Sequence, residues 1–179
     1  MHRANSERRA LRATARVAVK PTLPPPDEMA SVVSGVTETM LGLTFRPDPE
    51  GAPWTHLVWR AAVLPIPGAF PLTVGLSSDK PGCEALGSKM FQVSPAEVSD
   101  DMVSDSLCEL VNMTAGLLKS HLELEQALGL PKVMPENQLP IPPPPQDTNR
   151  VVLRADRLGL VLWVFEGLVG PEEARCQQS

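Results

Sequence analysis

The stretch DSLCELVNMTAG, residues 105–116, has the spacing of a helix and carries a line of polar side chains. At about 100° per residue, Asp105, Glu109, Asn112 and Gly116 fall within roughly 60° of one another on the helix. The opposite side of the same helix is apolar, with Val103, Leu107, Leu110, Val111, Thr114, Leu117 and Leu118. We therefore predict an amphipathic helix from about residue 100 to 124, with its apolar side toward a core and its polar line outward.

The polar line is compatible with a purely structural role, because every amphipathic helix has a solvated face. Two of its members are nevertheless unusual there. Asn112 is a poor helix former, and Gly116 costs about 1 kcal/mol relative to Ala in a helix interior. Gly116 would also let another surface approach the backbone closely. The line is therefore a candidate functional surface.

The composition is that of a soluble globular domain. The chain has 179 residues, of which 42% are hydrophobic and 21% charged. Its net charge of −5 and its 4% of aromatic residues argue against a nucleic-acid partner. No run approaches the roughly 20 apolar residues of a membrane span. The three cysteines lack metal-ligand spacing, which is typical of the reduced thiols of a cytoplasmic protein.

Three regions are expected along the chain. Residues 1–26 form a basic, proline-ended segment that we expect to be a disordered tail, with docking to a partner as the alternative. Residues 27–170 form the folded domain, and residues 171–179 a C-terminal tail. The PPPP run at 142–145 is interpreted as a stiff loop between strands, with recognition by an SH3-like partner as the alternative.

The remaining elements follow from local spacing. Residues 27–43 have helical spacing, and a short helix is predicted after Pro81. WTHLVWRAAVLPIP, residues 54–67, has strand composition and is closed by two prolines. FPLTVGLS, residues 70–77, alternates between an apolar face and a face with Thr73 and Gly75. The last third contains a strand from residue 132, a loop, and a hairpin over residues 149–167.

The order helix, strand, strand thus occurs twice, which indicates an internal duplication. Ser34 and Glu38 on the first long helix stand 71 positions before Asp105 and Glu109 on the second. We predict an α+β fold of duplicated helix-strand-strand units, with two long helices packed on a mainly antiparallel sheet.

These residues carry a resemblance to a known family. The spacing of four residues resembles the signature of the CheC/CheX/FliY family of chemotaxis phosphatases. Asp105 is followed after three residues by Glu109, after two more by Asn112, and after a further 22 by Pro135. The likeness extends over roughly residues 27–170. It is greatest to CheX, which uses a single site, because Leu41 stands where a second Asn would follow Ser34 and Glu38. These three residues are therefore expected to be a degenerate second site.

The resemblance implies a phosphatase that acts on the aspartyl-phosphate of a CheY-type receiver domain. It implies that Asn112 positions the attacking water and that Glu109 pairs with the receiver's lysine, with Asp105 and Gly116 on the same docking edge. Pro135 is interpreted as structural, opening the next strand. Neither a metal site nor a cofactor of its own is expected, since Mg²⁺ belongs to the receiver, and a homodimer is expected from related CheX proteins. The alternatives are a non-catalytic module that binds a receiver or a flagellar-switch partner, and a purely structural domain.

Overall fold

The computed structural model describes residues 20–50, 53–135 and 149–168. Its helices are α2 (Pro26–Leu41), α3 (Lys80–Phe91) and α4 (Asp100–His121), with 3₁₀ turns η1 (Trp54–Leu57) and η2 (Pro95–Glu97). Its strands are β1 (Arg46–Pro47), β2 (Arg60–Ile66), β3 (Leu72–Ser78), β4 (Lys132–Pro135), β5 (Asn149–Ala155) and β6 (Leu158–Glu166). The tail residues 1–19 and 171–179, the PPPP run and Cys176 lie outside the described residues.

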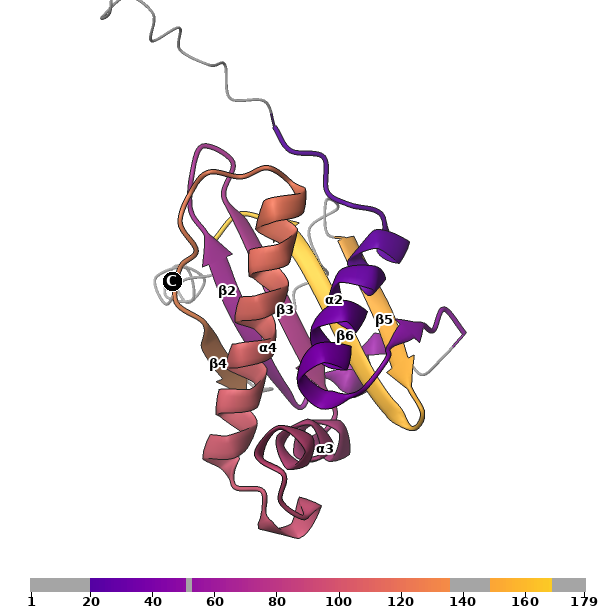
Figure 1. The fold of residues 1–179 in the computed structure, drawn as a ribbon. Coiled ribbons are helices and arrows are strands. Elements are labelled where there is room, and N and C mark those ends of the chain that lie inside the picture. The colour runs from indigo at the N-terminus through magenta and orange to yellow at the C-terminus, as the bar shows by residue number, and fades with distance from the viewer. Residues whose placement is uncertain (1–19, 51–52, 136–148, 169–179) are drawn as a thin grey trace, which may run out of the picture.

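The six strands form one antiparallel sheet in the order β1-β5-β6-β3-β2-β4 (Figure 1). Hairpin β2–β3 follows α2, and hairpin β5–β6 follows α4. The short strand β1 pairs with β5, whereas β4 pairs with β2. The first strand of each unit therefore pairs with the edge of the other unit's hairpin. Pairing of β3 with β6 joins the two units at the centre of the sheet.

This arrangement confirms the predicted α+β fold and its duplication. Each unit has three strands where the sequence predicted about two for the first. The additional strand of the first unit, β1, has only two residues and is too short to give a periodic signal.

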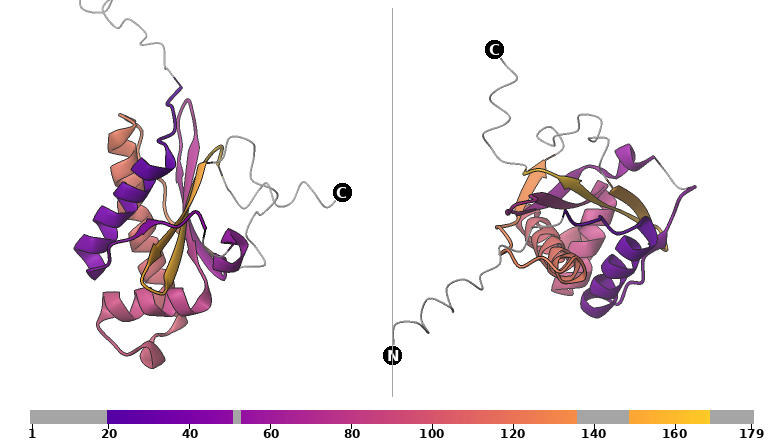
Figure 2. Two further views of the ribbon diagram at one scale, coloured as in Figure 1. Left: turned by 90° about the vertical axis from the view of Figure 1, so that its right-hand side faces the viewer. Right: turned by 90° about the horizontal axis from the view of Figure 1, so that it is seen from above.

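The helices cover one face of the sheet, with α2 and α4 side by side (Figure 2). On that face, every second residue of a strand packs against the apolar sides of the helices. This is expected because side chains alternate between the two faces of a strand and recur every 3.6 residues around a helix. The most deeply buried large side chains of this core include Met29, Leu64, Leu76, Leu86, Leu107, Leu110, Leu153 and Leu162. The core thus fixes which side of α4 is left for solvent.

Strand β3 is buried on both faces, including the face on which the predicted alternation places Thr73 and Gly75. Thr73, Gly75 and Ser77 are as inaccessible as the leucines and valine between them. A Cβ at Gly75 would lie 2.2 Å from ring atoms of Trp163 on β6, so the glycine leaves the space that the indole fills. The short polar side chains of β3 therefore mark close packing rather than exposure to solvent.

Pro65 lies within β2, whereas the sequence predicted a strand from residue 54 that Pro65 and Pro67 close. Residues 54–57 form η1 instead, and β2 begins at Arg60. A proline is tolerated at position 65 because β4 pairs only with Arg60–Val63, so no strand needs a donor from it on that side. Its carbonyl accepts a hydrogen bond from Gly129 N–H at 2.8 Å.

The segment that precedes α2 packs along the domain. Leu23 contacts the core, and the Asn149 side chain donates to the Pro24 carbonyl at 3.0 Å. Lys20 Nζ lies 2.7 Å from Glu166 Oε1. Residues 20–26, predicted as part of a disordered tail, therefore pack against the domain. Among the described residues, no helix is long and apolar enough to cross a membrane.

Candidate functional site

Several side chains stabilise the first turn of helix α4. The hydroxyl of Ser99 accepts a hydrogen bond from Met102 N–H at 3.2 Å, and Asp100 and Asp101 place negative charge at the positive end of the helix dipole. Arg60 on β2 donates to Asp100 Oδ2 at 2.7 Å. The other end carries Lys119 and His121, which suit the negative end of the dipole.

The polar line lies on the outward side of α4, as predicted. Asp105, Glu109 and Asn112 are exposed, whereas Gly116 is half-buried. A Cβ at Gly116 would lie 4.0 Å from Leu128, so the chain's own connection after α4 passes over this position.

The predicted apolar side of α4 is buried except at Leu117. This leucine is 47% exposed, and the prediction that it faces the core is wrong. Leu117 lies at the margin of the apolar side of the helix. Helical spacing predicts the direction in which a side chain points, but not how far the neighbouring elements extend to cover it. The other six predicted core positions of α4 are buried.

A surface groove of about 530 Å³ collects three of the predicted site residues. Its lining consists of Met90, Phe91, Asp105, Cys108, Glu109, Asn112, Gly129, Leu130 and Pro131. Gly116 is not part of this lining. Pro135 is the last residue of β4, paired with Arg60, so it closes that strand rather than opening it as predicted.

The walls of the groove come from residues that sequence reasoning did not select. Met90 and Phe91 are the last two residues of α3, and Gly129–Pro131 belong to the connection between α4 and β4. In Figure 1 the connection descends along the β4 side of α4, and α3 lies at the other side of its lower half. No periodic pattern singles out these positions, because each lies at the end of an element or in a loop.

The polar side chains of the groove are uncommitted within the described part of the chain. No hydrogen bond or ion pair there engages the side chain of Asp105, Glu109 or Asn112. Burial, and secondly the charge of Asp105, raises the pKa of the Cys108 thiol. The groove thus contains an acidic pair, a neutral amide and a protonated thiol. No cluster of potential metal ligands occurs among the described residues.

The corresponding face of α2 is built differently. Glu38 is exposed, the hydroxyl of Ser34 is buried, and Leu41 is 7% exposed. Helix α2 ends at Leu41, because Gly42 adopts φ 66° and its N–H bonds back to the Glu38 carbonyl. The Leu41 side chain consequently turns into the core, whereas Asn112 lies within α4, which continues to His121.

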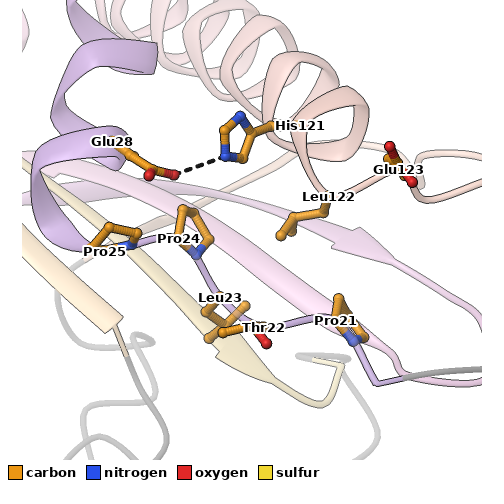
Figure 3. Close-up of a pocket in the computed structure, with 9 residues that line it drawn as sticks. All are labelled: Pro21, Thr22, Leu23, Pro24, Pro25, Glu28, His121, Leu122 and Glu123. Carbon is orange, nitrogen blue, oxygen red and sulfur yellow. Dashed lines mark hydrogen bonds and ion pairs between the residues drawn. The ribbon is translucent and has the colours of Figure 1, made fainter.

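A second hollow lies between the start of α2 and the end of α4 (Figure 3). Pro21–Pro25 form its floor, and His121 Nε2 lies 2.8 Å from Glu28 Oε2 across it. This pair joins the two long helices at the end of α4 that is remote from the groove. Both side chains are about half exposed, so we assign the pair a modest structural role.

Comparison with known proteins gives a consistent family and fold. The family model described as chemotaxis phosphatase CheX matches residues 60–155 of the chain. A crystal structure of the chemotaxis protein CheX from Vibrio vulnificus is similar with a TM-score of 0.64 at 14% identity, covering 78% of this chain and 93% of that one. Comparison of the sequence with curated proteins returned no match.

Two further solved structures are informative about the fold. The CheX–CheY–BeF₃–Mg²⁺ complex from Borrelia burgdorferi gives a TM-score of 0.60 at 13% identity, covering 82% of this chain and 100% of that one. The FliM middle domain from H. pylori gives a TM-score of 0.54 at 10% identity, covering 82% and 90%.

Proposed function

Because the chain belongs to the CheX family of chemotaxis phosphatases, we propose that it hydrolyses the aspartyl-phosphate of a CheY-type receiver domain at the groove of α4. The observation that carries this proposal is the placement of Glu109 and Asn112. Both are exposed on one face of α4 in the same groove, and neither side chain is engaged within the described residues. The complex of a similar CheX with CheY supports the choice of partner.

Asn112 is proposed to position the water. Its amide donates one hydrogen bond and accepts another, so it can hold a water in line with the phosphorus without acting as a strong base. The water oxygen bonds to phosphorus as the bond to the receiver's carboxylate oxygen breaks, which yields inorganic phosphate and free aspartate. Such phosphoryl transfer depends mainly on positioning and electrostatics, so a single well-aimed amide is an adequate contribution. The Mg²⁺ that neutralises charge belongs to the receiver.

Glu109 is proposed to dock the receiver through its lysine. A carboxylate repels a phosphoryl group, so Glu109 serves binding better than chemistry, and a carboxylate–ammonium pair also orients the two proteins. Asp105, one turn earlier on the same face, adds negative charge to the docking edge. The alternative function is a module that binds the receiver or a flagellar-switch partner without turnover.

Decay of a phosphorylated receiver from the same genome tests the proposal. We expect acceleration by the wild-type protein and a loss of about 100-fold with Asn112→Ala, the scale of losing one well-placed polar group. Receiver binding should persist in that variant. Glu109→Ala should instead weaken association by about ten-fold or more. Glu38→Ala is the matched control, because Glu38 is exposed at the equivalent position of α2, outside the groove.

The outcomes separate the candidate functions. Binding without acceleration by wild type would favour the non-catalytic module. Equal acceleration by wild type and Asn112→Ala would exclude the amide as the positioning group. The homodimer remains a prediction from the family resemblance, and light scattering of the purified full chain tests it. The cytoplasmic location remains a prediction from the cysteines.

A further inference from the structure

We propose that Phe91 and Leu130 are the apolar contacts that determine how tightly this protein holds its receiver. This inference rests on the proposed function and extends the site beyond the polar line of α4. Phe91 is 40% exposed and Leu130 is 80% exposed. Of the five large hydrophobic side chains exposed among the described residues, only these two line the groove. A second protein is the partner that would cover both.

Both residues are held at fixed places. Gly129 donates its N–H to the Pro65 carbonyl, and a Cβ there would lie 2.6 Å from the Pro65 ring, so only glycine allows this close approach. Leu130 follows directly and points away from a firmly attached backbone. Phe91 ends α3, where Gln92 adopts φ 56° and bonds back to the Ser88 carbonyl. The exposure of the two side chains is therefore built into the fold.

The charges of the groove indicate why apolar contacts are needed. Among the residues that the structure describes, the charged lining residues are Asp105 and Glu109, both acidic, and none is basic. An aspartyl-phosphate would be repelled by such a surface, and the neutral amide of Asn112 offers little compensation. A receiver lysine offsets part of this repulsion. The remaining affinity is expected from surface without charge, which Phe91 and Leu130 provide in the same groove as Asn112.

The partner surface follows from these features. It must carry a basic side chain for Glu109 and apolar side chains near the phosphorylated carboxylate. Receivers with such apolar residues should be preferred over receivers with charged residues at those positions, since an unpaired charge facing Phe91 or Leu130 would lose its hydration without compensation. The two apolar side chains are thus specificity-determining positions.

Phe91→Ala and Leu130→Ala test the inference in the full chain, with Leu168→Ala as the control. Leu168 is 41% exposed and does not line the groove. For each groove variant we expect KM for the phosphorylated receiver to rise about ten-fold, the equivalent of about 1.4 kcal/mol, with kcat within about two-fold. Affinity for the receiver loaded with beryllium fluoride and Mg²⁺ should fall by the same factor. Leu130→Met should restore it, because a long apolar side chain is kept.

An unchanged KM and affinity in both groove variants would overturn the inference, as would a fall in kcat with KM unaltered. An equal loss in Leu168→Ala would do the same. The proposed function can fail separately. If wild type binds the loaded receiver but does not accelerate its dephosphorylation, the enzyme proposal fails, while the affinities of Phe91→Ala and Leu130→Ala still decide the inference. If wild type binds no receiver, both fail.

Discussion

Exchanging the residues at the two equivalent helix positions, Leu41 and Asn112, should separate stability from activity. Leu41 is 7% exposed at the end of α2 and belongs to the core. Leu41→Asn removes a buried leucine, worth about 1.5–3 kcal/mol. It also buries an amide, which costs about 1–3 kcal/mol without a full set of partners. We expect the free energy of unfolding to fall by about 3–5 kcal/mol, a large part of the roughly 5–15 kcal/mol typical of a domain.

The reverse exchange should leave stability unchanged. Asn112 is exposed within α4, and leucine has the higher helix propensity, so Asn112→Leu should shift the free energy of unfolding by less than about 0.7 kcal/mol. It should nevertheless abolish receiver dephosphorylation under the proposed mechanism, because leucine cannot hold a water. Leu41→Asn should create no second site, since the new amide lies inside the core.

Urea denaturation followed by tryptophan fluorescence measures the stabilities, and decay of the phosphorylated receiver measures activity. Leu41→Met is the control, because it conserves volume and should cost less than about 1.5 kcal/mol. The reasoning is refuted if Leu41→Asn stays within about 1 kcal/mol of wild type. It is equally refuted if Leu41→Asn restores dephosphorylation to Asn112→Ala.

Three further predictions concern the scaffold. Gly75→Ala should lower the free energy of unfolding by about 1–3 kcal/mol and shift the fluorescence of Trp163, because the new methyl group overlaps the indole; urea titration and emission spectra check this. Burial, and secondly the charge of Asp79, raises the pKa of Cys83 to about 12 from its ordinary 9.0, so the folded chain keeps a proton that the unfolded chain loses. The free energy of unfolding should therefore be greatest below pH 9 and fall toward pH 12, more steeply in wild type than in Cys83→Ala, as urea titrations at several pH values would measure. His121→Ala should cost less than about 1 kcal/mol, because its contact with Glu28 is half exposed; a larger cost in urea titration would contradict this.

Much of the fold and the polar part of the candidate site could be predicted from the sequence, because both depend on residues close together in the chain. Helical spacing places Asp105, Glu109 and Asn112 on one line of α4 whatever that helix packs against. The core positions of the same helix follow from the same geometry, and the duplication is visible because each long helix precedes a pair of strands. The groove walls could not be predicted in this way, because Phe91 and Leu130 meet the line only after α3 and the connection have packed.

The sequence alone therefore predicts most of the elements, their order, the family resemblance and the line of candidate residues on α4. Tertiary packing sets the exchange of β1 and β4 between the two units, the fit of Gly75 against Trp163, and the exposure of Leu117. It also decided that Leu41 turns into the core where Asn112 faces solvent. The physical reason is common to all of these. Backbone periodicity sets direction within an element, whereas burial depends on which distant segments arrive beside it and how far they extend.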